Sequence, residues 1–600
     1  MSIAIDKLLA AQPNTERGRP TQLSADPKGE RIAYAAIFLR SIDDPAISKQ
    51  YNNHIHTTTV ARFSPSGYFV ASGDASGIVK VWDAVEGVNT KGTYPIISGR
   101  INDIAWDGDS QRIIAVGDGR EMYGRCITAD SGNSVGEISG HSKVINTVAI
   151  RQQRPMRAAT VSDDSSMVFL HGAPFKYNAK VGGLHKGYVY GVGFSPDGAH
   201  LVSVGTDRKI QLYDGKTGKA TTQIGDGEHT GSIFSVSWAK DSKRLVTASA
   251  DQSVKLWDFE VGKAVQTWKF GGDGISVPDH QVGVVWPSRS DGLIVSVNLA
   301  GDLNYLVEGS SKPTKFVQGH NKAISALGSG VTDKGQTFWT GSYEGRVCSW
   351  NYETGAGTVV EGSHTNQLTA FESTIDRTYS VAWDDTLRIS DNKNDIFIGE
   401  ATKLTAQPKG MALADGRLFV ATGKSVDIFI DESLVDSVPM TDTTAISAHG
   451  SLVAIGNEKH KVEIYTVGSD NKLRLVEELL DSTEIITALA FSRDGGLLAV
   501  GNTKGKIRVY NTATWDTKTD RWSAHTARIM SIDWNAEGTH AVSGSLDTYV
   551  YVWSLKSPGS RVKAPNAHNE GVFGVCWLDD GKKVASTGGD GALKIWDVKL

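Results

Sequence analysis

The stretch HTGSIFSVSWAKDSKRLVTASADQSVKLWD, residues 229–258, decides the fold. Apolar and polar residues alternate in three short runs, which is the period of a β-strand whose side chains point to opposite faces. Polar turns separate the runs, and the third run ends in an aromatic residue. The arrangement returns as HTARIMSIDWNAEGTHAVSGSLDTYVYVW at 525–553 and HNEGVFGVCWLDDGKKVASTGGDGALKIWD at 568–597. The chain is therefore built from repeated β-units.

Fourteen such units follow one another at a spacing of about 40 residues, and four strands per unit at this spacing are typical of a β-propeller blade. They begin near Thr21, His56, Arg100, His141, His185, His229, Gln281, His320, His364, Gln407, Thr443, Ser482, His525 and His568. Propellers typically have four to eight blades. We therefore expect an all-β chain with two seven-bladed propellers in tandem, at residues 13–318 and 319–600.

The last unit leaves one strand unaccounted for. It stops at IWDVKL, residues 595–600, after three strands. An open blade would expose an unpaired edge. Residues 1–12 precede the first full unit, and we expect them to cross back as the outer strand of the last blade. The alternative is a frayed terminal tail.

The units resemble the WD-repeat family, in which a His, a Ser or Thr, an Asp and a Trp lock each blade. The matching sets are His229, Ser249, Asp251 and Trp257, and His525, Ser545, Asp547 and Trp553. Such a set is stable when buried because each polar group finds a hydrogen-bond partner. Other units depart from the pattern. Gly588 takes the hydroxyl position in the unit of His568 and Asp590, and Ser76 stands where the unit ending at Trp82 should have its Asp.

Paired carboxylates at Asp163–Asp164 and Asp384–Asp385 could serve general acid–base chemistry. Both pairs fall in the turn where the repeat places its structural Asp, so we assign that role to Asp164 and Asp385 and leave Asp163 as a surface contact. The segment GNTKGKI from Gly501 lacks the length and context of a phosphate-binding loop. The three cysteines have no metal-ligand spacing. We expect no catalysis, no metal and no cofactor.

Composition narrows the possible partners. The net charge is −5 and no run of Lys and Arg stands out, which argues against nucleic acid. No apolar run approaches the roughly 20 residues that span a bilayer, and the first residues do not form a signal peptide. We expect a cytoplasmic monomer that binds other proteins through its loops.

Two stretches depart from the repeat. VGDGREMYGRC, residues 116–126, lengthens a turn and adds charge and an aromatic ring. SDDSSMVFLHGAPFKYNAK, residues 162–180, places a proline, two aromatic residues and a lysine where a plain outer strand should start. Exposed aromatic side chains beside charges are typical of interface anchors. The alternative is local packing of a twisted blade.

At these stretches the chain resembles the actin-interacting protein 1 family, and the resemblance extends over essentially its whole length. Motifs that carry it include GDGREMYG at 117–124, GHSKVIN at 140–146, APFKY at 173–177, QVGVVW at 281–286, GHNKAISAL at 319–327 and WDDTLR at 383–388. Several of these are not general WD-repeat features, so the match is more specific than the fold.

The resemblance implies a non-enzymatic scaffold that binds actin filaments decorated with cofilin (actin-depolymerizing factor). It implies that the scaffold promotes severing and disassembly, with capping of filament ends, in the cortical actin cytoskeleton. It also implies a clamshell of two propellers. The family's contact positions map onto Glu121, Asp163, Lys176, Tyr177 and Tyr188. The family often has Phe at the positions of Tyr177 and Tyr188, and the aromatic ring is kept here.

Two other readings remain open at this point. A generic WD-repeat adaptor shares the fold but does not require GREMYG or APFKY. A propeller enzyme needs a cluster of His and carboxylates in its central channel, and the sequence indicates none.

Overall fold

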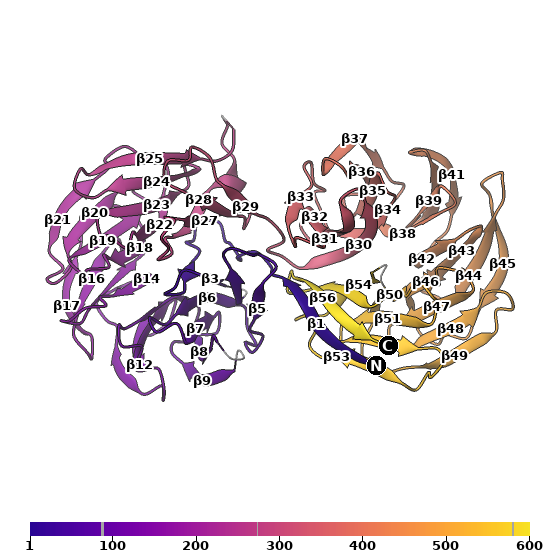
Figure 1. Cartoon of the computed structure of the whole chain (residues 1–600), viewed down its shortest axis with the longest axis horizontal. Helices are drawn as coiled ribbons and strands as arrows, with labels where there is room; N and C mark the ends of the chain where they lie inside the picture. Colours follow the sequence, from indigo (N-terminus) through magenta and orange to yellow (C-terminus); the bar gives the residue numbers. More distant parts are fainter. Residues whose placement is uncertain (36, 86–88, 273, 579–580) are drawn as a thin grey trace. The chain divides into compact units, whose positions relative to one another are not determined.

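The structure consists of two compact units. The computed structural model describes residues 1–600 except 36, 86–88, 273 and 579–580. One unit is Gln12–Asn321, and the other combines Lys322–Leu600 with Met1–Ala11. Each unit is a ring of seven four-stranded antiparallel sheets (Figure 1). The predicted all-β fold of two seven-bladed propellers is confirmed.

In the first ring every blade takes its four strands from consecutive chain. The blades are β2 (Ser24–Ala25), β3 (Arg31–Tyr34), β4 (Phe38–Ser41) and β5 (Ser48–Gln50); β6 (Thr58–Phe63), β7 (Phe69–Asp74), β8 (Ile78–Asp83) and β9 (Thr90–Pro95); β10 (Ile101–Trp106), β11 (Arg112–Gly117), β12 (Gly124–Thr128) and β13 (Ser134–Glu137); β14 (Ile145–Ile150), β15 (Arg157–Ser162), β16 (Met167–His171) and β17 (Lys176–Val181); β18 (Val189–Phe194), β19 (His200–Gly205), β20 (Ile210–Asp214) and β21 (Ala220–Ile224); β22 (Ile233–Trp238), β23 (Arg244–Ser249), β24 (Ser253–Asp258) and β25 (Lys263–Lys269); and, after the short 3₁₀ helix η1 (Val277–Asp279), β26 (Gln281–Val285), β27 (Ile294–Asn298), β28 (Leu303–Leu306) and β29 (Lys315–Val317).

In the second ring only the last blade departs from this rule. Its blades are β30 (Ile324–Thr332), β31 (Gly335–Ser342), β32 (Val347–Asn351) and β33 (Gly357–Val359); β34 (Leu368–Ser373), β35 (Arg377–Ala382), β36 (Thr386–Asp391) and β37 (Ile396–Lys403); β38 (Pro408–Ala414), β39 (Arg417–Thr422), β40 (Ser425–Ile430) and β41 (Ser433–Pro439); β42 (Thr443–His449), β43 (Leu452–Asn457), β44 (Val462–Val467) and β45 (Leu473–Leu479); β46 (Ile486–Phe491), β47 (Leu497–Asn502), β48 (Ile507–Asn511) and β49 (Thr517–Trp522); β50 (Ile529–Trp534), β51 (His540–Ser545), β52 (Val550–Ser554) and β53 (Arg561–Ala564); and β54 (Val572–Trp577), β55 (Lys583–Gly588), β56 (Leu593–Lys599) and β1 (Ser2–Leu9).

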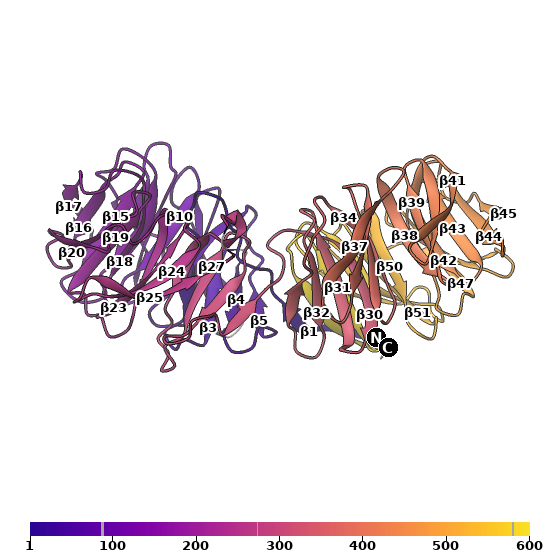
Figure 2. The same ribbon diagram turned by 90° about the horizontal axis from the view of Figure 1, so that it is seen from above.

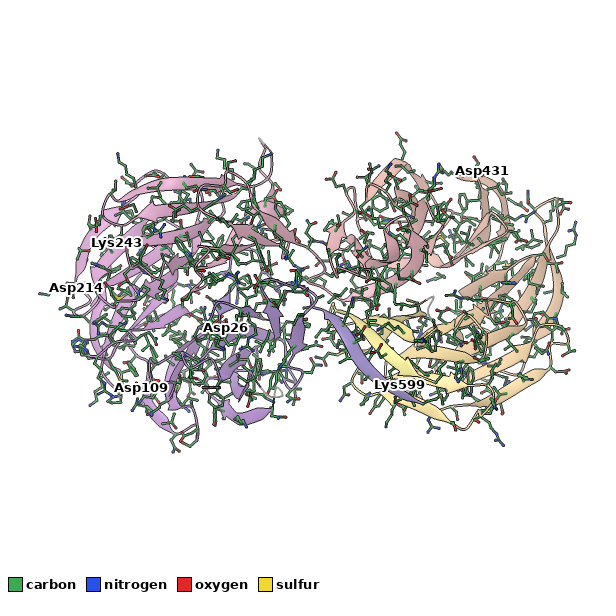
Figure 3. All side chains as sticks on the ribbon, viewed as in Figure 1. Asp26, Asp109, Asp214, Lys243, Asp431 and Lys599 are labelled. Carbon is green, nitrogen blue, oxygen red and sulfur yellow. The ribbon has the colours of Figure 1, made fainter. Side chains whose placement is uncertain are left out.

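The last blade of the second ring takes its outer strand from the other end of the chain. β1 pairs antiparallel with β56, from Ser2 opposite Lys599 to Leu9 opposite Leu593 (Figure 3). The chain ends therefore lie side by side in this ring (Figure 1, Figure 2). The unit boundaries fall after residue 11, where we expected 12, and after 321, where we expected 318.

The core of each ring lies between neighbouring sheets. The inward-facing residues of β19, β20, β22 and β23 pack around Trp257, which is fully buried. Each sheet buries both of its faces against its neighbours, and β23, the second strand of its blade, is therefore buried at every position but its first.

The polar set predicted for the blade of β22–β25 is confirmed in kind, but its hydroxyl was wrongly assigned. His229 Nδ1 lies 2.7 Å from Asp251 Oδ2, and His229 Nε2 lies 2.8 Å from Thr247 Oγ1. Trp257 Nε1 donates to the same Thr247 Oγ1 at 2.8 Å. Ser249 instead donates to the Gly231 carbonyl. Residues two apart in a strand face the same side, so sequence spacing alone did not distinguish them.

The same correction applies in the second ring, where Ser543 and not Ser545 joins His525 and Trp553. Ser545 donates to the Ala527 carbonyl. The last blade also has a complete set. Its hydroxyl is Ser586 and not Gly588, with His568 2.6 Å from Asp590 and Trp596 donating to Ser586 at 2.7 Å.

Two further assignments were wrong by a short step along the chain. The second blade has a complete set made by His54, Ser72, Asp74 and Trp82. Its Asp lies two residues before Ser76, which donates to it, and its His lies two residues before His56. In the ninth blade His364 pairs with Asp384 at 3.0 Å, and not with Asp385. Asp385 is the next residue of the turn and has a φ of 57°. Asp164 does pair with His141, as expected, at 3.1 Å.

Candidate functional site

Three of the five predicted contact residues lie at one end of the first ring's sheets. Inner strands begin at this end, and the turns between second and third strands return to it because neighbouring strands are antiparallel. Glu121 lies in the turn between β11 and β12, and Asp163 in the turn between β15 and β16. Tyr188 lies directly before β18 and is 47% exposed. We call this end of the first ring, with Glu121, Asp163 and Tyr188, the entry face.

Lys176 and Tyr177 are placed differently. They are the first residues of the outer strand β17, which begins at the opposite end of its sheet. Tyr177 is half exposed, and its ring covers Gly140 so closely that a Cβ there would lie 2.7 Å from a ring atom. Gly140 belongs to the connection that leads into β14. The Tyr177 ring therefore contacts a connection of the entry face, whereas Lys176 lies exposed on the outer edge of the blade.

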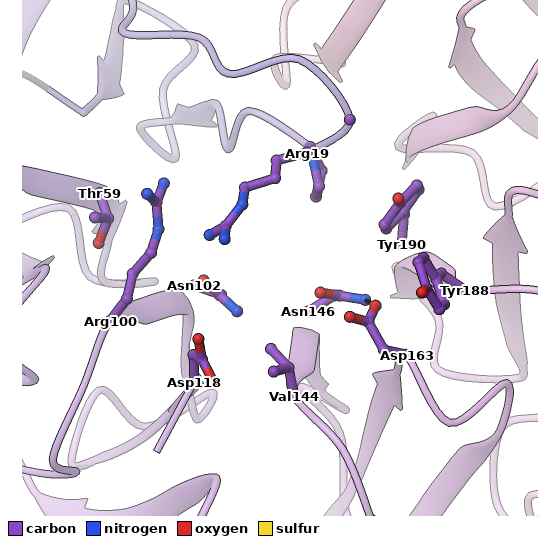
Figure 4. A pocket seen from close by; sticks show the side chains of 12 residues that line it. Arg19, Thr59, Arg100, Asn102, Asp118, Val144, Asn146, Asp163, Tyr188 and Tyr190 are labelled. Carbon is purple, nitrogen blue, oxygen red and sulfur yellow. Dashed lines mark hydrogen bonds between the residues drawn. The ribbon is translucent and has the colours of Figure 1, made fainter. Parts of the chain in front are cut away.

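A pocket of about 150 Å³ opens on the entry face (Figure 4). Asp163 and Tyr188 line it together with residues that the sequence analysis did not select: Gly18, Arg19, Pro20, Thr59, Arg100, Asn102, Asp118, Val144, Asn146 and Tyr190. A signal for some of them was present in the repeat. Asp118 and Asp163 each directly follow the second strand of their blade, and Asn102 and Asn146 are each the second residue of an inner strand.

Hydrogen bonds between blades position the pocket's polar side chains. Asn102 Nδ2 donates to the Ile145 carbonyl at 3.0 Å, and Asn146 Nδ2 donates to the Val189 carbonyl at 2.9 Å. Asn146 Nδ2 also donates to Asp163 Oδ1 at 2.8 Å. The carboxylate of Asp163 is thus fixed by the same side chain that joins two inner strands.

The pocket has a positive and a negative side (Figure 4). Arg100 Nη1 lies 2.5 Å from Glu16 Oε1, and Arg19 Nε lies 3.3 Å from Glu16 Oε2. Both guanidinium groups therefore share one carboxylate. Burial, and after it the negative charge of Asp163, raises the pKa of Tyr190 to about 12, so its hydroxyl stays protonated at neutral pH.

Three further features concern metal ions, thiols and membranes. Within the described ranges, no three His, Cys, Asp or Glu side chains are grouped so that they could hold a metal ion. Burial raises the pKa of the Cys126 and Cys576 thiols to about 12, so neither forms a reactive thiolate. Over the same described ranges, no helix is long and apolar enough to cross a membrane.

The blades and their polar sets define a WD-repeat propeller protein. The family model of the WD domain, G-beta repeat, matches residues 47–83, 181–214, 222–258 and 559–597. The model of the anaphase-promoting complex subunit 4 WD40 domain matches residues 445–537.

Full-length relatives identify the family within this class. A WD repeat-containing protein of Schizosaccharomyces pombe is 40% identical over 100% of both chains. WD repeat-containing protein 1-B of Xenopus laevis is 36% identical, again over 100% of both chains. Actin-interacting protein 1 of Drosophila melanogaster is 35% identical over 99% of this chain and 98% of its own. The chain belongs to the actin-interacting protein 1 (WD repeat-containing protein 1) family.

Proposed function

We propose that this protein binds actin filaments decorated with cofilin and promotes their severing and disassembly, with capping of the filament ends. The observation that carries the proposal is the match, at 35% identity over 99% of this chain, to a relative named for its interaction with actin. The protein acts as a monomeric scaffold in the cytoplasm, at cortical actin structures, and not as an enzyme.

The proposed contact surface is the entry face of the first ring together with the neighbouring outer strand. Glu121, Asp163 and Tyr188 supply charge and an aromatic ring from the loops, and Lys176 and Tyr177 supply the same chemistry from β17. Half-exposed tyrosines beside charged groups suit an interface anchor, because the ring buries apolar area and the hydroxyl remains solvated.

The mechanism is differential binding. Cofilin changes the twist of the filament, and a rigid scaffold that fits the altered lattice better than the bare one stabilises the altered and severed states. Two rings that engage one filament raise the effective concentration of the second contact. If the first ring alone, Gln12–Asn321, disassembled cofilin-bound filaments as well as the full chain, the contribution of the second ring would be disproved.

Sedimentation of actin filaments with this protein, with and without cofilin, tests the proposal. We expect a cofilin-dependent rise in the actin that stays in the supernatant. Asp163→Lys should reduce that rise strongly. The matched control is Asp109→Lys, an exposed carboxylate in the turn between β10 and β11, at the opposite end of the sheet. An unchanged supernatant with the wild-type protein would favour the generic adaptor instead.

A further inference from the structure

The pocket on the entry face has the size of a site for one side chain. Its volume of about 150 Å³ is well below that of pockets that hold drug-sized ligands, about 300–1,000 Å³. It lies where the inner strands β6, β10, β14 and β18 begin, so residues of four blades line it. A protruding residue of a protein partner fits this space, and an extended peptide does not.

The charges of the pocket favour a cationic group. Asp118 and Asp163 both line it, and among the described residues neither carboxylate lies within ion-pair distance of a Lys, Arg or His. The two arginines share Glu16. The lining has two positive and two negative side chains, and Glu16 beside the arginines brings the net charge of the five groups to −1. Both arginines are paired with Glu16, whereas the two aspartates have no ion-pair partner in the described part of the chain, so the pocket attracts a cation more strongly than an acidic group.

The aromatic wall points to the same ligand. Tyr190 is only 8% exposed and stacks on Phe234 with ring centroids 5.2 Å apart. Across the described ranges its hydroxyl has no hydrogen-bond partner, although it lines the pocket. A tyrosine hydroxyl at the end of a buried ring is available to a group that enters the pocket. The half-exposed Tyr188 ring lies 6.4 Å from it, edge to face, and a ring face is a binding surface for cations.

We propose that this pocket receives one basic side chain, lysine or arginine, of the protein partner. Asp118 and Asp163 bind its cationic head, and Tyr188 and Tyr190 contact its stem. This assignment rests on the proposed function for the identity of the partner, but not for the chemistry of the pocket. It adds Asp118 and Tyr190 to the contact residues.

Co-sedimentation with cofilin-decorated filaments tests whether the side chain that enters the pocket is positively charged. Asp118→Lys should weaken binding about tenfold or more, and Asp118→Asn should weaken it less. Arg19→Glu, which replaces a positive charge of the lining by a negative one, should strengthen binding, and Asp109→Lys should leave it unchanged. Equal binding by the wild type and Asp118→Lys would overturn the proposal. Weakening by Arg19→Glu with no effect of Asp118→Lys would assign an acidic occupant instead.

A second measurement does not depend on actin. In saturation-transfer NMR with the full chain, we expect Nα-acetylarginine amide or Nα-acetyllysine amide to give a signal and Nα-acetylglutamate amide to give none. The signal should disappear in the Asp118→Asn, Asp163→Asn double variant, whose unfolding temperature serves as the folding control. No signal from either cation would overturn the pocket assignment. A cation signal without binding to cofilin-actin would contradict the proposed function and leave the pocket assignment standing.

Discussion

The two rings close in different ways. In the first ring every blade, including the last, β26–β29, is made from consecutive chain. Hydrogen bonds then join the ends, from the Thr21 N–H to the Val282 carbonyl and from the Thr15 hydroxyl to the Leu299 carbonyl. In the second ring the last blade is completed by β1. A repeat sequence can therefore form a ring with or without a strand from another part of the chain. The second ring depends on such a distant segment, β1, and the first ring does not.

The rings also differ at equivalent loop positions. In two blades of the first ring, the third and the fourth, the residue that follows the second strand is acidic, Asp118 and Asp163. In three blades of the second ring the same position holds a large apolar residue, Tyr343, Trp383 or Leu546, which are 41%, 42% and 40% exposed. The Tyr343 ring contacts Phe573 edge to face at 5.9 Å. These loop residues lie outside the buried polar sets, so they can differ without changing the fold. The two rings therefore share a fold but have different surfaces.

The largest expected effect tests the difference in closure. Deletion of residues 1–9 removes β1, exposes the edge of β56 and uncovers the apolar surface that Leu8 and Leu9 bury. The second ring should lose more than about 3 kcal/mol of stability, and the first should lose none. Hydrogen exchange measured on peptides of each ring separates the two. Ile5→Ser, at a position 50% exposed, is the control and should have little effect. Equal loss of protection from hydrogen exchange in both rings would contradict the proposed difference in how the rings close.

A smaller effect is expected from the buried polar set, which occurs in blades of both rings. Thr247→Val leaves His229 Nε2 and Trp257 Nε1 without their common partner and should cost about 2 kcal/mol. Ser249→Ala removes a hydrogen bond to the Gly231 carbonyl and should cost about 1 kcal/mol or less. Urea unfolding of the two variants compares them. A larger loss for Ser249→Ala would show that the sequence-based assignment of the hydroxyl was the better one.

Low pH should lower the stability that the polar set of the same blade provides, because the set contains the carboxylate of Asp251. Burial alone would raise the pKa of the Asp251 carboxyl, but hydrogen bonds from His229, Ser253 and the Thr230 N–H outweigh it and lower the pKa from 3.8 to about 2. The carboxylate therefore stabilises the blade above pH 4, and this contribution, about 1–2 kcal/mol, is lost as the pH falls toward 2. Urea unfolding between pH 6 and 2.5 measures it. In Asp251→Asn the dependence on pH should be shallower, and an unchanged slope would exclude this carboxyl as its source.

The smallest expected effect concerns the ion pairs that link β1 to the last blade of the second ring. Lys583 Nζ lies 2.6 Å from Asp6 on β1 and 2.6 Å from Asp597 on β56, so it links the borrowed strand to its neighbour. Because this pair of contacts is partly exposed, Lys583→Met should cost about 1 kcal/mol or less, and only in the second ring. Hydrogen exchange of β1 should accelerate slightly at low salt and hardly at all at high salt. Faster exchange in the first ring would contradict a local role.

Much of the fold could be predicted from residues 229–258 and their repeats. The alternation specified strands, and the spacing specified blades, because both are local properties of the chain. The errors in the polar sets have one cause. Thr247 and Ser249 point to the same side of β23, and so do Ser543 and Ser545 of β51, so only the contacts of the buried Trp and His identify the hydroxyl. The contact residues came from family resemblance, which did not include Asp118 or Tyr190.

By itself, the sequence determined that this chain forms fourteen blades in two rings, because every repeat carries its own alternation and several carry their own locking residues. It also indicated that the last blade lacked a strand. Only the tertiary structure decided the register of β1 on β56 and the pairing of Lys583 with both strands. Only the tertiary structure brought Asp118, Asp163 and Tyr190 to one pocket, because these residues belong to three blades that meet when the ring closes.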